Sequence, residues 1–186
     1  MVTFASTNQN KFKEVQSILK ACSISVDFAQ VNPVEIQSDS LEEIAREKAK
    51  SAFSHVGRPV IVEDDGLFID VLKGFPGQYS SYVFKTIGNR GIMKLLDGEP
   101  DRRASFRSLI AFYDGSDLSI SEGRVDGRIS EKIAEGGWGY DPIFIPAGSD
   151  LTFAELKEKK NDYSHRRAAL EKFALWYKQR TRDSGL

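Results

Sequence analysis

The most constraining stretch of the sequence is an apolar run that ends in three consecutive acids. Val60–Val62 is β-branched throughout, leads directly into Glu63–Asp65, and is followed after Gly66 by a second apolar run. Such a run predicts a buried strand. Three adjacent carboxylates repel one another, and desolvation increases the repulsion. A divalent cation would offset it because hard cations bind oxygen ligands, so the stretch predicts a metal site beside a buried strand.

The same stretch has a simpler interpretation. Asp65-Gly66 between two apolar runs is a strong hairpin-turn signal, and the acids would then form the solvated tip of a hairpin. Short motifs often match by chance, so the choice depends on the rest of the chain.

Composition narrows the class of protein. A chain of 186 residues suits one domain, or one domain with two lobes. Its 26 basic and 27 acidic residues give a net charge of −1, which argues against general affinity for nucleic acid or anionic membranes. Cys22 is the only cysteine, which excludes an intrachain disulfide and a cysteine-based metal site. Without a signal peptide or an apolar stretch of roughly 20 residues, we expect a soluble cytoplasmic protein.

The N-terminal pattern is strand, polar turn, helix. Val2–Ala5 predicts a short strand and Ser6–Asn10 a polar turn, after which apolar residues recur at helical spacing. Lys11 falls in the first helical turn, where a cation opposes the helix dipole unless an anion such as phosphate binds in front of it. The turn lacks the glycines of a Walker loop. The alternative is an Asn-capped helix with an exposed lysine.

Two further candidates follow before the acidic strand. Glu35 lies in an extended segment after Pro33 and should point away from its apolar neighbours Val34 and Ile36. Ser40–Glu43 has the pattern of a capping box at the start of an amphipathic helix. Lys48 lies at the edge of its apolar face, either as a snorkelling surface lysine or as a ligand contact.

The second half of the chain predicts a helix over 87–96 and strands over 102–113 and 118–129, with Asp114–Asp117 as the connection. The region from about 75 to 129 is a possible second lobe. Gly136–Pro142 combines three glycines with Trp138 and Tyr140, whose faces suit stacking on a base. The alternative is a tight loop whose aromatic side chains fill the core.

A second basic helix start lies near the C-terminus. Lys157, Lys159 and Lys160 form a basic cluster, and Ser164 is a good N-cap for a helix whose first turn contains His165 and Arg166. Two basic helix starts, a set of metal-binding acids and a glycine-aromatic loop would all be satisfied by a nucleoside triphosphate with magnesium.

At this point the sequence resembles the inosine triphosphate pyrophosphatase family, nearly from end to end. Five blocks in order carry the resemblance: Ser6–Lys11, Val62–Leu67, Gly74–Ser80, Trp138–Pro142, and Lys160-Asn161 with Ser164–Arg166. The resemblance implies an α/β fold with two lobes, a long mixed central β-sheet flanked by helices, and an active-site cleft between the lobes. It also implies a single pyrophosphatase domain over 1–186, a homodimer, and hydrolysis of non-canonical purine nucleoside triphosphates to the monophosphate and pyrophosphate.

The resemblance also implies roles for individual residues. Glu35 and Asp64 would hold Mg²⁺, with Asp64 as the proton acceptor. The residues implied to bind the nucleotide are Ser6, Thr7, Asn8, Gln9, Asn10 and Lys11 at the phosphates, Trp138, Gly139, Tyr140 and Asp141 around the base, and Lys160, His165 and Arg166. Lys48 matches only with a one-residue shift.

Two positions depart from the family pattern. Trp138 stands where phenylalanine is commoner and keeps a flat stacking face. Asp65 stands where the family commonly has a hydroxyl residue that touches the substrate, and a carboxylate cannot donate that hydrogen bond. Asp65 would then bind a second metal, position water, or compete with Asp64 as the base. The competing functions are a non-catalytic nucleotide-binding module and a Maf-type nucleotide pyrophosphatase of other specificity.

Overall fold

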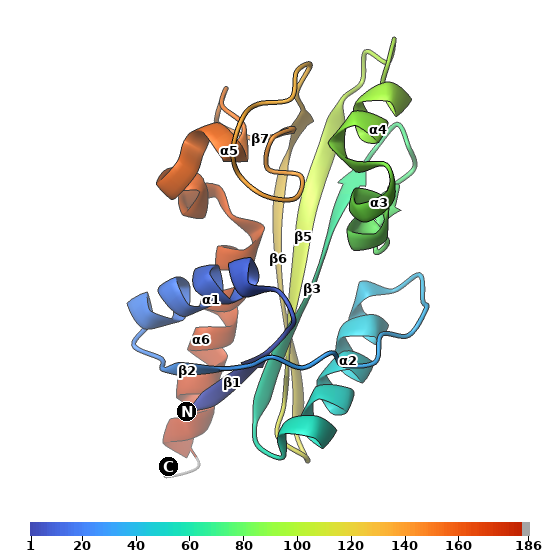
Figure 1. The fold of residues 1–186 in the computed structure, drawn as a ribbon. Coiled ribbons are helices and arrows are strands. Elements are labelled where there is room, and N and C mark those ends of the chain that lie inside the picture. Colours follow the sequence, from blue (N-terminus) through green and yellow to red (C-terminus); the bar gives the residue numbers. More distant parts are fainter. Residues whose placement is uncertain (184–186) are drawn as a thin grey trace. The chain divides into compact units, whose positions relative to one another are not determined.

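The computed structural model describes residues 1–183, and Figure 1 shows its α/β architecture. The strands are β1 Val2–Ala5, β2 Val26–Ala29, β3 Val60–Ile69, β4 Pro76–Gly77, β5 Arg103–Tyr113, β6 Leu118–Ile129 and β7 Phe144–Pro146. The helices are α1 Gln9–Ala21, α2 Leu41–Val56, α3 Ser80–Thr86, α4 Gly88–Leu95, α5 Phe153–Leu156 and α6 His165–Asp183, with a 3₁₀ segment at Lys157–Tyr163.

All seven strands belong to one mixed sheet. The order is β2-β1-β3-β5-β6-β7, and β4 pairs with β3. β1 pairs in parallel with both β2 and β3, whereas the β3–β4 and β6–β7 pairs are antiparallel. The inner position of β1 fits its sequence, because all four of its residues are buried and three are apolar. The predicted α/β fold class with a mixed sheet is therefore confirmed.

The chain divides into two compact units. The first unit contains residues 1–64, 108–123 and 166–186. Residues 184–186 lie outside the described part of the chain. Its core joins apolar side chains of β1, such as Phe4, to Leu19 of α1 and Phe173 of α6. Helix α2 packs on the other side of this part of the sheet from α1 and α6 (Figure 1). The Phe53 ring of α2 lies edge-on to Tyr113 of β5, with 5.3 Å between the ring centroids.

The second unit contains residues 65–107 and 124–165. Its core is rich in aromatic rings: Phe106 of β5 lies 4.8 Å from Phe144 of β7 and 6.0 Å from Phe153 of α5. Apolar residues of α3 and α4 complete this core. The possible second lobe at 75–129 shares residues 75–107 and 124–129 with this unit.

The hairpin interpretation of the acidic stretch is wrong. β3 runs for ten residues without a break through Asp65-Gly66. Gly66 serves close packing and not a turn, because a Cβ there would lie 2.4 Å from the carbonyl oxygen of Gly77 on β4. The acids therefore lie along a strand of the sheet, where successive side chains point to opposite faces.

The predicted capping box at the start of α2 is only half formed. Ser40 is the N-cap, and its hydroxyl accepts a hydrogen bond from the Glu43 N–H at 3.3 Å. The Glu43 carboxylate does not return to the Ser40 backbone but accepts from the Ser38 hydroxyl at 2.6 Å. The Ser38 hydroxyl in turn accepts from the Ser40 N–H at 3.0 Å. It therefore replaces the Glu43 carboxylate as the acceptor that a capping box would provide for this N–H.

Within the described chain, no helix has the length and apolar character needed to cross a membrane.

Candidate functional site

The turn between β1 and α1 presents several polar side chains. Asn8 is the N-cap of α1, and its Oδ1 accepts from the backbone N–H of Asn10 at 3.0 Å and of Lys11 at 3.2 Å. The N–H of Asn8 itself donates to Ser6 Oγ at 3.0 Å. Thr7, Gln9 and Asn10 are exposed, whereas Ser6, Asn8 and Lys11 are half-buried. The Asn-capped helix is therefore present, and the exposed side of the turn carries amide and hydroxyl groups that suit phosphate oxygens.

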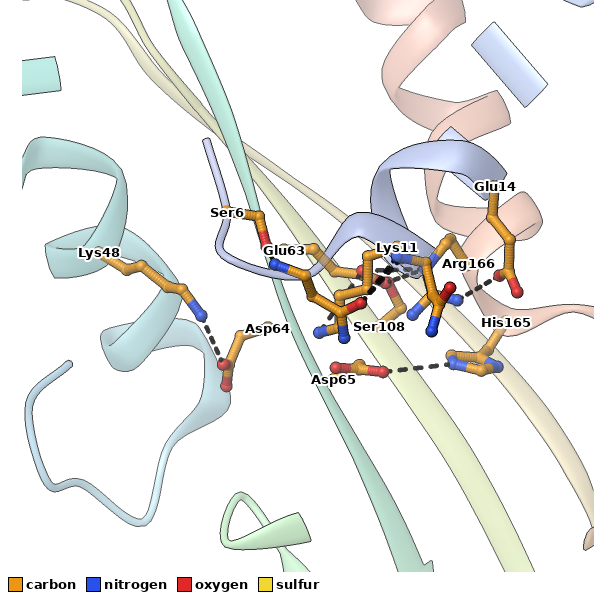
Figure 2. Close-up of polar contacts among 12 residues, drawn as sticks. Ser6, Lys11, Glu14, Lys48, Glu63, Asp64, Asp65, Ser108, His165 and Arg166 are labelled. Carbon is orange, nitrogen blue, oxygen red and sulfur yellow. Dashed lines mark hydrogen bonds and ion pairs between the residues drawn. The ribbon is translucent and has the colours of Figure 1, made fainter. Parts of the chain in front are cut away.

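A buried carboxylate, Glu63 of β3, organises the charges of the first unit (Figure 2). Glu63 is 3% exposed. It accepts hydrogen bonds from Arg166 Nε at 2.8 and 2.9 Å and from the Ser108 hydroxyl at 2.7 Å. Lys11 Nζ lies 3.6 Å from its second oxygen. A buried carboxylate is unfavourable without hydrogen-bond and charge partners, and these contacts supply both to Glu63.

Arg166 is the matching buried cation. It is 1% exposed, and besides Glu63 it makes an ion pair with Glu14 of α1. Two cations and two anions, Lys11, Arg166, Glu14 and Glu63, thus balance within one network (Figure 2). The network ties α1, β3 and the start of α6 together. It fixes the backbone from which the predicted phosphate contact Lys11 projects.

On the opposite face of β3, Asp64 shares a cation with Glu35. The Lys48 ammonium of α2 lies 2.5 Å from Glu35 Oε1 and 3.4 Å from Asp64 Oδ1. Lys48 is only 9% exposed, so the interpretation as a snorkelling surface lysine is wrong. The lysine instead balances two carboxylates that come from separate parts of the sequence.

The Glu35 and Asp64 pair fits a divalent ion. Both carboxylates face one positive charge, the Lys48 ammonium, which marks a position where a cation is accepted. Within residues 1–183, no three His, Cys, Asp or Glu side chains gather closely enough to form a metal site by themselves. Two carboxylates are nevertheless the usual protein contribution to magnesium, since water and substrate phosphates supply the other ligands.

Asp65 has a different partner from Asp64. Its Oδ2 lies 4.0 Å from His165 Nε2 (Figure 2). The His165 ring is 3% exposed and stacks on Phe106 with 4.6 Å between centroids and 9° between planes. The stacking on Phe106 sets the plane of the imidazole, and the Asp65 carboxylate lies on the Nε2 side of the ring. The unusual Asp65 thus belongs with His165, and alternation along β3 points it away from the Asp64 face.

The glycine-aromatic loop separates its two aromatic residues. Trp138 is half-buried, whereas Tyr140 is 5% exposed and donates its hydroxyl to the Ser80 carbonyl at 2.9 Å. Burial also raises the pKa of Tyr140. The core-filling interpretation is therefore correct for Tyr140, while Trp138 remains the candidate stacking surface. Gly137 is needed here because its φ is +67° and a Cβ would approach the Asp141 Cβ to 2.7 Å.

Lys160 holds this loop in place from the 3₁₀ segment. Its Nζ donates to Asp141 Oδ2 at 2.9 Å and lies 4.8 Å from the Trp138 ring centroid. The backbone N–H of Trp138 donates to the same Asp141 oxygen at 3.3 Å. Three of the predicted substrate contacts, Trp138, Asp141 and Lys160, are therefore brought together, with the cation fixed against the face of the indole.

The match to a family model covers residues 2–176 and identifies the Ham1 family. The chain belongs to the Ham1 family. It is 51% identical over 180 residues to the dITP/XTP pyrophosphatase of Methanopyrus kandleri, a match that covers 95% of this chain and 96% of that protein. The corresponding enzyme of Thermococcus kodakarensis is 48% identical over 180 residues, covering 96% and 97%. The HAM1 protein of Coxiella burnetii has a solved structure with TM-score 0.82 and 30% identity, covering 96% and 98%.

The sequence of this Ham1 chain does not single out Glu63, Ser108 or Glu14 as residues that support the site. The resemblance assigns Arg166 to the nucleotide, whereas its guanidinium pairs with Glu63 and Glu14. Glu63 was grouped with its neighbours as a metal-binding acid, although strand alternation separates it from Asp64. Its partners Ser108 and Arg166 lie 45 and 103 positions away. Strand alternation was the available signal for Glu63. For Glu14, on the side of α1 that meets Arg166, the sequence offered none.

Proposed function

We propose that this protein hydrolyses non-canonical purine nucleoside triphosphates such as dITP and XTP to the monophosphate and pyrophosphate, with magnesium as cofactor. Support comes from relatives near 50% identity over almost the full chain that are named dITP/XTP pyrophosphatases. The structural observation that carries the proposal is the pair of carboxylates, Glu35 and Asp64, around one cation position. Hydrolysis would remove these nucleotides from the pool available to polymerases.

The triphosphate is bound by the turn before α1. Lys11 contacts the phosphates with its ammonium, and the exposed side chains of Thr7, Gln9 and Asn10 supply hydrogen bonds. Ser6 and Asn8 shape the turn through their own hydrogen bonds. Lys48 and Lys160 add positive charge near the phosphates as negative charge moves to the leaving pyrophosphate.

Glu35 and Asp64 hold the metal, which when bound neutralises phosphate charge and polarises the phosphorus centre. Asp64 also orients the attacking water and accepts its proton, because its carboxylate is the half-buried acid on the cation-binding face of β3. Asp65 is the weaker candidate for the base, because its carboxylate faces His165 on the opposite face of the strand.

The purine base is recognised by a stacking surface and by hydrogen-bond donors. Trp138 stacks on the base, and the Gly139–Asp141 backbone passes close to its edge. His165 donates toward the 6-keto oxygen of hypoxanthine or xanthine, while Arg166, buried against Glu63 and Glu14, positions the helix turn that carries His165. Adenine presents an amino group there, so the His165 donor would be left unpaired and ATP would be rejected. We further propose a cytoplasmic homodimer, on the sequence resemblance.

The deciding experiment measures pyrophosphate release from ITP, XTP, GTP and ATP with and without magnesium. We expect rapid, magnesium-dependent release from ITP and XTP and much slower release from ATP. Equal rates with ATP and ITP would refute the base-recognition part. Binding of ITP without any release would indicate a nucleotide sensor and refute catalysis.

A further inference from the structure

Lys48 lies on the buried face of α2, which is an unusual place for a lysine. The buried residues of this helix are Leu41, Ile44, Ala45, Lys48, Ala49 and Ala52. All of them except Lys48 are apolar, and Lys48 is only 9% exposed. A lysine is almost never buried unless its charge is paired. The partners of its ammonium therefore explain why a lysine is tolerated on this face.

The Lys48 ammonium lies between two carboxylates. Nζ is 2.5 Å from Glu35 Oε1 and 3.4 Å from Asp64 Oδ1, and Figure 2 shows the Asp64 contact. The side chains of Lys48 and Asp64 are 11% and 13% exposed, so solvent screens their attraction only weakly. All three residues belong to the first unit. The ammonium thus has the position that these two acids offer to a divalent ion.

The segment that carries Glu35 has a second attachment to α2. The N–H of Val34 donates to the Ser51 hydroxyl at 3.0 Å. Ser51 follows Lys48 by three positions on the helix, so the two side chains lie on the same side of α2. This hydrogen bond does not involve Lys48. It therefore keeps Glu35 beside Asp64 even when the ammonium moves away.

Lys48 and a divalent ion compete for the same carboxylate oxygens. One ammonium neutralises one of the two carboxylate charges, whereas a divalent ion neutralises both. Together the two cations would exceed the charge of the two acids, and they would repel each other at short range in a partly buried site. A lysine is suited to leave, because its ammonium is a compact charge on a flexible four-carbon stem.

We propose that Lys48 and magnesium exclude each other at Glu35 and Asp64. Lys48 is then the internal counter-ion of the free protein, and it weakens metal binding until the nucleotide arrives. The inference rests on the proposed function in taking the metal to be magnesium and the anion to be a triphosphate. The phosphates supply the negative charge that the displaced ammonium needs, so the metal and the triphosphate bind more tightly together than separately.

The first test measures binding of Mn²⁺, a paramagnetic substitute for magnesium, to the full chain without nucleotide by electron paramagnetic resonance. Lys48→Met should bind Mn²⁺ about 10- to 100-fold more tightly than the natural chain, because the metal no longer displaces charge-assisted hydrogen bonds. Lys48→Arg should bind it as weakly as the natural chain, because a guanidinium keeps the charge and pairs well with carboxylates.

Lys50→Met is the matched control for the loss of one positive charge from α2. Lys50 lies two positions after Lys48, but its side chain is 52% exposed and pairs with Glu47 at 2.7 Å. Solvent screens such a charge, so the affinity for Mn²⁺ should change by less than about twofold.

The second test measures the displacement of Lys48 in the natural chain. Lysines are modified with an acylating reagent, and the modified positions are mapped by peptide mass spectrometry. Lys48 should react slowly without metal, because it is buried and paired, and several-fold faster at saturating magnesium. Lys50 should react at the same rate in both conditions, since its pair with Glu47 is exposed.

Unchanged or weaker Mn²⁺ binding in Lys48→Met would overturn the proposal. Tighter binding without a change in Lys48 reactivity would also overturn it, because the metal and the lysine would then bind side by side. If Lys48→Met does not fold without metal, Lys48→Arg and the reactivity of the natural chain decide. Neither readout uses a nucleotide, so exclusion in a protein that fails to hydrolyse ITP would refute the proposed function alone.

Discussion

Arg166 donates from one nitrogen to both carboxylate oxygens of Glu63, at 2.8 and 2.9 Å, with both side chains almost completely buried. The pair joins the end of the apolar half of β3 to the first turn of α6. Such a pair adds little stability over an apolar one, but removal of one partner leaves an uncompensated charge in the core. The pair therefore serves mainly to hold β3 and the first turn of α6 in a fixed position relative to each other.

Replacement of Glu63 should destabilise the fold strongly. Glu63→Gln removes the carboxylate that pairs with the Arg166 guanidinium and lies beside Lys11, so the free energy of unfolding should fall by about 3–5 kcal/mol. Equilibrium unfolding in urea measures this change in the free energy of unfolding. The control is Glu42→Gln, which breaks an exposed pair with Arg46 and should cost less than about 1 kcal/mol. Similar losses in the two variants would show that the buried contacts of Glu63 stabilise the fold no more than an exposed pair does.

Replacement of Asp64 should greatly slow the turnover of ITP but leave the binding of the product IMP largely intact. Asp64→Asn keeps the size of the side chain but removes the proton acceptor and one metal ligand, so kcat for ITP should fall by roughly 10²–10⁴-fold. The affinity for IMP without magnesium should change little. Asp65→Asn is the comparison, since Asp65 contacts His165 and lies on the other face of the strand. A larger loss of kcat in Asp65→Asn would make Asp65 the base.

Glu35 should control the metal requirement more than the chemistry. Its side chain is 59% exposed and reaches the shared cation position from an extended segment. Glu35→Gln should raise the magnesium concentration for half-maximal activity about tenfold, the effect of one lost charged ligand, and leave the ratio of ITP to ATP turnover unchanged. Glu47→Gln, in an exposed pair with Lys50, is the control. An unaltered magnesium requirement would remove Glu35 from the metal site.

Local sequence patterns predicted the strands whose limits depend only on neighbouring residues. β1 was predicted at Val2–Ala5, and β5 and β6 within one residue, because apolar runs and turn residues act over a few positions. The acid run was ambiguous because Asp65-Gly66 carries a turn signal, and only the packing of Gly66 against Gly77 decides it.

Pairing over long sequence distances could not be predicted from residues alone. Alternation along β3 separates Glu63 from Asp64, but it does not reveal that Arg166, 103 positions later, meets Glu63. Trp138 and Tyr140 look equivalent in sequence. Only the tertiary contact of the Tyr140 hydroxyl with Ser80 shows which ring fills the core and which is half-buried.

Trp138 should contribute to binding of the purine base and not to binding of the phosphates. Trp138→Ala should raise KM for ITP about 10- to 100-fold, the range for loss of one stacking contact, whereas Trp138→Phe should retain most of the affinity. Pyrophosphate binding should be unaffected in both. Steady-state kinetics and calorimetry give the two readouts. If Trp138→Phe behaved like Trp138→Ala, hydrogen bonding or packing of the indole, and not its flat face, would be what matters.

Acid should weaken the first unit through Asp114, in the turn between β5 and β6. Burial favours the neutral carboxyl, but backbone hydrogen bonds from Asp117 and Ser116, the Ser116 hydroxyl and Arg180 outweigh it, so the pKa of Asp114 is lowered from 3.8. A lowered pKa means that the folded state binds the proton less tightly than the unfolded state. The contribution to stability is therefore complete above about pH 4 and is lost as the pH falls through the folded pKa.

Urea midpoints between pH 6 and pH 2.5 should show this loss, and Asp114→Asn should remove part of the slope below pH 4. Asp117→Asn is the control, because its carboxylate pairs with the same Arg180 at 2.9 Å but is 63% exposed. It should change the slope less, since solvent screens an exposed pair. An identical pH dependence in Asp114→Asn and the natural chain would mean that the carboxyl has its ordinary pKa and that Arg180 does not stabilise its charge.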